Sequence, residues 1–392
     1  MNRNSVSLRT AAGICAIAGF SLSGGTAVVH ATEPQTAAAP KTAAPVTSSY
    51  LYSRPAIMSL MRRACDYQLA EQAKTRPNNG WIRATFYTGV LAAYRTAGKD
   101  PKYKDAAIKW GEASKWTPSP RDPRHADNQA CIQVYTELYE MNKTADWIAP
   151  SRAAIDAQIA APKPGREQWW WCDALFMAPP AYTRLSAVTG DPKYNAFMNN
   201  QYWDSKEFLY DKEEDLFYRD KNYFKGRTKN GQKIFWSRGN GWVFGGLARV
   251  LEYLPPSDPQ YANYVGLYKE MAAKLAQLQG ADGLWRSSLL DPTHFPMPET
   301  SGSAFYTYGL AWGINHNILD RATYLPIVQK GWLGLTAQVN AEGRLGYVQK
   351  VAGAPGASRP EDTQEYAVGA LLLAGEQMAE LAKSNTKTAA HR

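Results

Sequence analysis

A short motif that recurs along the chain is the sequence feature that most limits its fold. Residues 94–107 (YRTAGKDPKYKDAA) resemble residues 185–198 (LSAVTGDPKYNAFM), and residues 254–267 (LPPSDPQYANYVGL) are a looser copy. Each copy combines the end of a helix, a turn with Gly or Ser followed by Asp and Pro, and the start of a second helix. The repeat therefore predicts a fold assembled from consecutive helix pairs.

The hydrophobic pattern supports helices throughout. In residues 81–97 the apolar side chains recur at steps of three and four residues, the period of an amphipathic helix. No segment shows the sustained alternation of a half-exposed strand. The second helix of each pair is expected to start near positions 81, 125, 171, 238, 303 and 362. Six pairs with spacings too uneven for a regular solenoid predict an all-α (α/α)6 toroid, with the inner helices starting around one funnel.

The N-terminal segment predicts export. Arg3 and Arg9 precede a mostly apolar stretch from Ala11 to Val29. Val29-His30-Ala31 then supplies small side chains at the two positions that a signal peptidase recognises. We therefore expect a signal peptide over residues 1–31 and a secreted or periplasmic protein. Residues 32–49 are rich in Ala, Pro and Thr and are typical of a flexible leader.

The remaining chain predicts a single folded unit. We assign residues 50–385 to one (α/α)6 domain and residues 386–392 to a short tail. A domain of this length has ample material for one buried core.

Composition and missing motifs exclude several functional classes. The formal net charge is +9, but no run of five basic residues occurs, so nucleic-acid binding is not indicated. The chain has no CxxC pair, no HExxH and no glycine-rich phosphate-binding motif. We therefore expect no metal, no cofactor, no membrane association and no protein partner. Outside the signal peptide only three cysteines remain, so disulfides do not hold the fold together.

Two carboxylates stand at expected starts of inner helices. Asp127 and Asp173 could each simply cap a helix, because Asp accepts hydrogen bonds from the first helical N–H groups. Asp173 differs in following three tryptophans, Trp169 to Trp171, and in preceding Leu175 and Phe176. Apolar neighbours raise the pKa of a carboxyl group, which a general acid working near neutral pH requires.

Residues 234–242 (IFWSRGNGW) form the most distinctive segment of the chain. Arg238 offers a planar fork suited to a substrate carboxylate. Trp236 and Trp242 offer flat faces on which a sugar ring stacks. The alternative interpretation is a helix start at which the arginine pairs with a local acid.

Two motifs together resemble a known family. WSRGNGW at 236–242 and WxxDALFMxPPxxxRLxxxTGDPKY at 170–194 are similar to the unsaturated rhamnogalacturonyl hydrolases, glycoside hydrolase family 105. That family is related to the unsaturated glucuronyl hydrolases of family 88, and the similarity extends over most of residues 55–383. The resemblance implies an (α/α)6 barrel. It also implies removal of a 4,5-unsaturated uronic acid from the non-reducing end of lyase-generated oligosaccharides, by hydration of the vinyl ether double bond.

The resemblance also implies roles for individual residues. Asp173 matches the general acid/base, which protonates C4 and then takes a proton from the water that attacks C5. Asp127 matches a second acidic residue that positions the substrate. Arg219 stands where some relatives carry a site histidine, and Asn128 stands where several carry an aspartate. The residues expected to contact the substrate are Trp236, Arg238, Trp242, His125, Trp171 and Arg219.

Two other functions remain open from the sequence. A conventional inverting glycosidase on the same fold would need two carboxylates about 6.5–9.5 Å apart. A non-catalytic carbohydrate-binding toroid would use the aromatic residues and leave Asp173 as a helix cap. The polymer that supplies the substrate is also open between pectic rhamnogalacturonan, algal ulvan and another uronate glycan.

Overall fold

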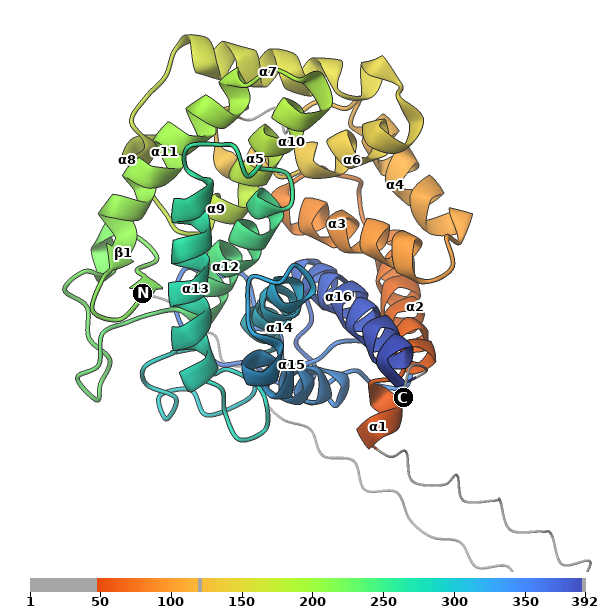
Figure 1. The fold of residues 1–392 in the computed structure, drawn as a ribbon, viewed down its shortest axis with the longest axis vertical. Coiled ribbons are helices and arrows are strands. Elements are labelled where there is room, and N and C mark those ends of the chain that lie inside the picture. Colours follow the sequence, from red (N-terminus) through yellow and green to blue (C-terminus); the bar gives the residue numbers. More distant parts are fainter. Residues whose placement is uncertain (1–47, 119–121, 390–392) are drawn as a thin grey trace, which may run out of the picture. The chain divides into compact units, whose positions relative to one another are not determined.

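The computed structural model describes residues 48–118 and 122–389 (Figure 1). The predicted signal peptide and residues 32–47 of the leader lie outside these ranges. Within them, long helices alternate along the chain between outer and inner positions, as the repeat predicts. None of these helices is long and apolar enough to cross a lipid bilayer.

The outer helices keep an exposed face, whereas the inner helices are largely buried. In the described ranges the outer helices are α2 (Arg54–Gln72), α4 (Pro101–Ala113), α7 (Ala149–Ala160), α11 (Lys193–Leu209), α13 (Tyr261–Gln277) and α15 (Arg321–Thr336). The inner helices are α3 (Trp81–Thr96), α6 (Ile132–Asn142), α10 (Pro179–Thr189), α12 (Ser237–Leu251), α14 (Thr300–Asn315) and α16 (Glu365–Ala389).

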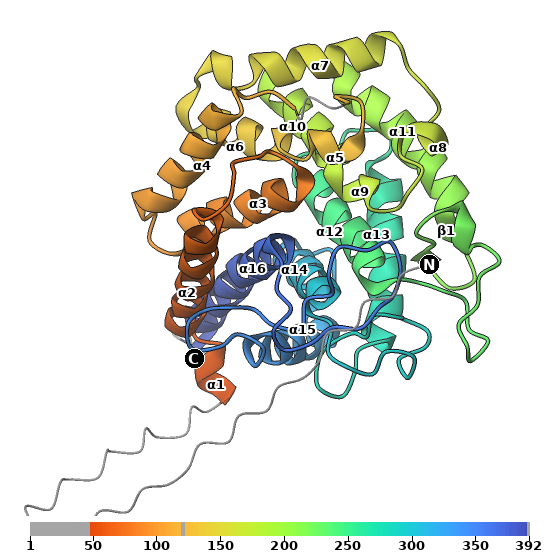
Figure 2. The same ribbon diagram turned by 180° about the vertical axis from the view of Figure 1, so that it is seen from behind.

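The inner helices form a closed ring in the order in which they occur along the chain. α3 contacts α6, α6 contacts α10, and the contacts continue through α12 and α14 to α16. α16 packs in turn against α3, so the last inner helix joins the first (Figures 1 and 2). This closed ring confirms the predicted all-α (α/α)6 toroid.

The recurring Asp-Pro motif forms the same turn in all three copies. In each copy the Asp carboxylate accepts a hydrogen bond from the backbone N–H two residues later. The distances are 3.1, 3.0 and 2.8 Å for Asp100, Asp191 and Asp258. Gly98 and Gly190, with φ of +89° and +71°, end the preceding inner helices in a conformation that favours glycine. The repeat is therefore a local turn that reverses the chain from an inner to an outer helix.

Two inner helices begin with a separate short helix. α5 (Ala126–Gln129) precedes α6, and α9 (Ala174–Met177) precedes α10. α10 begins at Pro179, because the first turn of a helix accommodates proline. The other short elements are α1 (Ser48–Leu51), the 3₁₀-helices η1 (Ala145–Trp147) and η2 (Lys221–Tyr223), and α8 (Gly165–Gln168).

The segment between the fourth outer helix and the fourth inner helix contains a small hairpin. α11 continues to the buried Leu209, because the apolar face of the helix extends that far. The hairpin follows: β1 (Tyr210–Asp211) pairs antiparallel with β2 (Leu216–Phe217), and Tyr210 lies opposite Phe217. The hairpin therefore starts directly after the end of α11.

Both domain boundaries differ slightly from the expected ones. α1 begins at Ser48, within the expected leader, and α16 continues to Ala389, within the expected tail. Helical hydrogen bonding thus extends beyond the positions at which the apolar periodicity of the sequence ends.

Aromatic side chains fill the core between the inner helices. Trp242 of α12 lies 4.5 Å from Phe305 of α14 and 5.0 Å from Phe176 of α9, measured between ring centroids. Trp242 also makes an edge-to-face contact with Trp81 of α3, with ring centroids 5.8 Å apart. Tyr366, at the start of α16, completes the group at 5.9 Å from Trp242. These rings tie the starts of four inner helices, α3, α12, α14 and α16, to the short helix α9.

A network of ion pairs links the inner helices toward their C-terminal ends. Arg95 of α3 pairs with Glu376 of α16 at 2.6 Å and also contacts Glu137 of α6. Arg184 of α10 pairs with Glu252 at 3.0 Å and lies 3.7 Å from Glu137. Alternating charges therefore join the helices at the end of the ring opposite the funnel.

Candidate active site

Asp173 lies where the chain turns into the third inner helix. It occupies the N-cap position of α9, yet its carboxylate accepts no capping hydrogen bond from that helix. Only 9% of the residue is exposed, and burial raises the pKa of its carboxyl group. The charges of Arg219 and Arg238 oppose this rise in pKa. The capping interpretation does not account for Asp173, whereas a buried carboxyl that retains a proton suits a general acid.

Arg219 forms an ion pair with Asp173. Its Nε atom lies 3.6 Å from Asp173 Oδ2, and its Nη1 atom lies 2.6 Å from Asp220 Oδ2. The Cζ atom is 5.2 Å from the ring centroid of Trp170, within the range of a cation–π contact. The backbone of Gly353 also packs on this guanidinium, since a Cβ atom there would come 3.3 Å from Cζ. The guanidinium of Arg219 therefore contacts Asp173, Trp170 and the loop that contains Gly353.

The backbone places Arg219 beside the third inner helix. The N–H of Cys172 donates a hydrogen bond of 2.9 Å to the carbonyl oxygen of Arg219. This bond ties the turn before α9 to the segment that follows β2. The hairpin and the α9 turn together bring residues 173 and 219 into contact.

Asp127 provides a second carboxyl whose pKa is strongly raised. Burial, and then the negative charge of Asp173, raise the pKa of Asp127 to about 7, while Arg219 opposes the rise. His125 Nδ1 lies 3.9 Å from Asp127 Oδ2, and burial lowers the pKa of that imidazole. The His125 ring packs against Trp171, with centroids 4.6 Å apart. The predicted residues His125, Asp127, Trp171, Asp173 and Arg219 are therefore brought together.

Asn128, the departure next to Asp127, has a structural contact. Its side-chain amide donates a hydrogen bond of 2.7 Å to the carbonyl oxygen of Asp122. The amide therefore supports the loop that leads into α5, a role for which a carboxylate lacks the donor.

Arg238 differs from its expected geometry. Its Nη1 and Nη2 atoms donate hydrogen bonds of 2.9 Å each to the backbone oxygens of Gln349 and Lys350. The guanidinium lies over the rings of Trp236 and Tyr366, at 4.4 and 5.0 Å, and the residue is 1% exposed. The fork that the sequence assigns to a substrate carboxylate thus holds two consecutive carbonyl groups of the protein. Among the described residues, the hydrogen-bond partners of Arg238 are a hydroxyl, an amide and backbone carbonyl groups, so the alternative of an ion pair with a local acid is not observed either.

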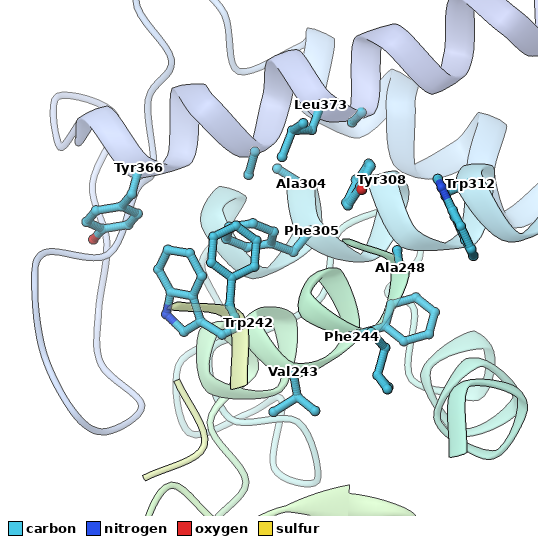
Figure 3. Packing of buried hydrophobic residues seen from close by; sticks show 14 of the residues in the cluster. Trp242, Val243, Phe244, Ala248, Ala304, Phe305, Tyr308, Trp312, Tyr366 and Leu373 are labelled. Carbon is cyan, nitrogen blue, oxygen red and sulfur yellow. The ribbon is translucent and has the colours of Figure 1, made fainter. Parts of the chain in front are cut away.

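Trp236 and Trp242 are both buried, at 2% and 1% exposure. Trp236 donates from Nε1 to Gln349 Oε1 at 2.7 Å, and Trp242 lies in the aromatic core (Figure 3). Both residues belong to the start of α12, where neighbouring protein groups cover their ring faces. The expected stacking of Trp242 on a sugar is not supported by its position. Trp170, which was not selected from the sequence, is 40% exposed next to Arg219.

Gln349 is a site residue that sequence reasoning missed. Its Oε1 atom accepts a hydrogen bond from Trp236, its backbone oxygen accepts from Arg238, and its Nε2 atom donates to Ala354 O at 2.7 Å. The Tyr366 hydroxyl also donates to its backbone oxygen, at 2.6 Å. The segment before α16 thereby crosses the starts of the inner helices (Figure 2). Its signal was the Gly- and Ala-rich run at 352–357, which is typical of a shaped loop.

Across residues 48–118 and 122–389, no three His, Cys, Asp or Glu side chains gather as a metal site would require. The group described above offers two carboxyls, two arginines and several aromatic rings.

Comparison with known proteins identifies the family. The model for Glycosyl Hydrolase Family 88 matches residues 54–382. The chain belongs to glycosyl hydrolase family 88. This confirms the resemblance to the related families 105 and 88, and it makes the protein a glycosidase.

Individual family 88 relatives match over most of their length. The chain is 37% identical over 344 residues to the unsaturated 3S-rhamnoglycuronyl hydrolase of Formosa agariphila, covering 83% of this chain and 91% of that protein. It is 35% identical over 329 residues to the protein of the same name from an Alteromonas species, covering 79% of each. A solved family 88 structure from Bacteroides vulgatus superposes with a TM-score of 0.78 at 30% identity, over 83% of this chain and 99% of that one.

Proposed function

We propose that this family 88 glycosidase removes a 4,5-unsaturated uronic acid from the non-reducing end of an oligosaccharide, with Asp173 as its general acid/base. The observation that carries the proposal is the pair of carboxyls formed by the buried Asp173 and the half-buried Asp127, both with raised pKa values. They lie beside a cation, Arg219, and the exposed ring of Trp170. A vinyl ether that carries a carboxylate suits such a group, since it needs a proton donor and a counter-charge.

The first step is proton transfer to carbon. Asp173 in its protonated form gives its proton to C4, and the electrons of the C4–C5 double bond form the new C–H bond. Positive charge develops at C5 and is shared with the ring oxygen. Burial of Asp173 favours the neutral carboxyl that this step requires near neutral pH.

The second step adds water. The carboxylate of Asp173 now takes a proton from a water molecule as its oxygen bonds to C5, which restores the acid for the next turnover. The product is a hemiketal that opens and releases the leaving sugar. Asp127, whose pKa lies at about 7, shares protons with the site over the same pH range and positions the substrate.

We also propose rhamnose as the leaving sugar. The support is that two relatives at 37% and 35% identity are named unsaturated 3S-rhamnoglycuronyl hydrolases. Trp170, 40% exposed, offers the apolar face on which a leaving sugar would pack. Rhamnogalacturonan and ulvan both remain possible sources of such a disaccharide.

The experiment follows the double bond directly by its ultraviolet absorbance. Purified protein is incubated with a panel of unsaturated disaccharides that differ in the uronic acid, in the leaving sugar and in sulfation at O3 of rhamnose. Absorbance should fall fastest with a rhamnose-linked uronate. Unchanged absorbance over the whole panel contradicts the proposed activity, and faster loss with a leaving sugar other than rhamnose contradicts the substrate assignment. An inverting glycosidase would instead cleave the saturated disaccharide, and a binding protein would cleave neither.

Export remains a proposal of its own, supported by Arg3 and Arg9 and by the small residues ending at Ala31. Expression of the full chain in a bacterium with Sec export tests it by N-terminal sequencing of the mature protein. A first residue of Thr32 is expected, and a retained Met1 in the cytoplasmic fraction contradicts export.

A further inference from the structure

Arg219 has one side of its guanidinium anchored and the other side weakly held. Nη1 lies 2.6 Å from Asp220, which is 2% exposed and also accepts a hydrogen bond from Asn222 N at 2.8 Å. Nε faces Asp173 at 3.6 Å, beyond the usual range for an N–H···O hydrogen bond. It is a buried donor with no hydrogen-bond partner among the described residues. The edge toward Asp173 is therefore available to a better acceptor.

The surroundings keep this guanidinium in a defined plane. The ring of Trp170 lies 5.2 Å from Cζ, and Gly353 lies so close that a Cβ atom there would come within 3.3 Å of Cζ. A planar group held in this way presents its free edge in one direction, which favours bidentate binding of a carboxylate. With 24% of its side chain exposed, Arg219 is also accessible from solvent.

Arg238 lacks these properties. Both of its Nη atoms already donate to backbone oxygens, those of Gln349 and Lys350, and the residue is 1% exposed. Binding a substrate carboxylate through that fork would first require breaking two charge-assisted hydrogen bonds. Nε lacks a hydrogen-bond partner among the described residues in both arginines whose charges act on Asp173, but only Arg219 is also partly exposed to solvent.

We propose that Arg219 changes partner during turnover: it pairs with Asp173 in the free protein and binds the uronate carboxylate in the complex, leaving Asp173 to carry the proton for C4. This inference rests on the proposed function. Arg219 is thus a positioning residue for Asp173 as well as a substrate ligand. Until an anionic substrate arrives, Arg219 opposes the effect of burial and favours the ionised form of Asp173.

The electrostatic consequence follows from the charges. In the complex Asp173 loses its positive partner and gains a negative neighbour, and both changes favour its protonated form. The proton comes from solvent when the substrate binds. It passes to C4, and the water that adds to C5 returns a proton to Asp173, so each turnover consumes one water and no net proton.

The wild-type protein supplies the first test. The pH dependence of kcat reports the protonation of groups in the complex. The comparison uses an unsaturated disaccharide and its analogue with the carboxylate reduced to an alcohol. With the substrate that carries the carboxylate, the alkaline fall in kcat should occur at least about one pH unit higher than with the reduced analogue. A shift of this size is the usual effect of an adjacent charge. A fall at the same pH with both substrates overturns the proposal.

Variants supply the second test. Arg219→Gln should raise KM for the acid about tenfold or more and abolish the difference between the two pH profiles. Lys221→Gln is the matched control, because it removes the same charge from an exposed side chain two residues away. If Arg219→Gln does not fold, Arg219→Lys retains the charge and the contact with Asp220 but lacks the fork. Arg219→Lys should then show the raised KM for the substrate that carries the carboxylate. The difference between its kcat–pH profiles with the two substrates should be smaller than in the wild type.

The outcomes separate this inference from the proposed function. If the wild type leaves the absorbance of every unsaturated disaccharide unchanged, the proposed function fails. If the wild type consumes the double bond and Arg219→Gln behaves like Lys221→Gln, only the partner exchange of Arg219 is overturned. If the wild type does not turn over the reduced analogue, the test is the KM of Arg219→Gln for the substrate that carries the carboxylate. A KM raised about tenfold supports the proposal, and a KM equal to that of Lys221→Gln overturns it.

Discussion

The Nη1 atom of Arg238 donates a 2.9 Å hydrogen bond to the backbone oxygen of Gln349, which joins the fourth inner helix to the segment preceding the sixth. Nη2 makes the equivalent bond to Lys350 O, so the guanidinium holds two consecutive peptide groups across the starts of the inner helices. The loop that contains Gly353, which packs on Arg219, is positioned by this contact. Arg238 therefore acts on the site through the backbone.

Arg238→Lys should impair turnover equally on the acid and on the carboxyl-reduced disaccharide. A lysine retains the charge but cannot donate to both carbonyl oxygens in the same plane. Loss of one charge-assisted hydrogen bond corresponds to about 1.5–3 kcal/mol, or a decrease in kcat/KM of about one to two orders of magnitude. Steady-state kinetics on both substrates checks this. A deficit confined to the acid would show that Arg238 binds the uronate directly.

Asp173→Asn should retain the fold and lose nearly all turnover. The amide cannot donate a proton to carbon and then accept one from water. General acid/base groups contribute about 10²–10⁴-fold in rate, and Asp173 is used twice in each cycle. The measurement is loss of ultraviolet absorbance, with circular dichroism as the control for folding. Activity above about a tenth of the wild type would transfer the role to another group, with Asp127 the first to examine.

Asp127→Asn should stabilise the protein at alkaline pH. The pKa of Asp127 is about 7 in the folded state, above its ordinary value, so the folded state binds a proton that the unfolded chain releases. Wild-type stability therefore falls as pH rises from about 4 to 7, and the full cost is present above pH 7. The asparagine variant should be more stable than the wild type by about 2–4 kcal/mol at pH 8 and by much less at pH 5. Urea unfolding at both values tests this, and equal differences would contradict the raised pKa.

Cys172→Ala should keep turnover within about tenfold of the wild type. Burial raises the pKa of the Cys172 thiol well above its ordinary value, so no thiolate forms at neutral pH. Its Sγ atom lies 3.6 Å from Asp173 Oδ2 and close to Gly239, where it fills space. Cys65 and Cys131 are likewise free and buried. Complete inactivation of the folded alanine variant would overturn this assignment.

Glu137→Gln should destabilise the domain without changing KM. Glu137 is paired with Arg95 and Arg184, and its side chain is only 6% exposed. Removing one partner from a buried ion pair costs about 3–5 kcal/mol, because the remaining charges stay buried. Glu71→Gln is the control, since its pair with Lys74 is exposed and worth at most about 1 kcal/mol. Equal melting temperatures for the two variants would contradict a structural role for the network.

The aspartates of the repeat show what the sequence determined by itself. Asp100, Asp191 and Asp258 each bind a backbone N–H only two residues away, so each turn depends on residues adjacent in the chain. Helix positions and the break at Pro179 follow from equally local preferences. The alternation of helices and the toroid could be predicted for that reason. The end of α11 was less predictable, because burial of Leu209 against the ring extends the helix.

The assignment of the two arginines was decided only by the tertiary structure. The sequence placed the fork at Arg238, but its donors are taken by Gln349 and Lys350, more than a hundred residues away in the chain. Arg219 meets Asp173 because the hairpin packs against the turn before α9. Trp242 is enclosed by rings from other inner helices in the same way. Residue type determines what a side chain can bind, whereas closure of the ring determines which acceptors, charges and apolar surfaces reach it.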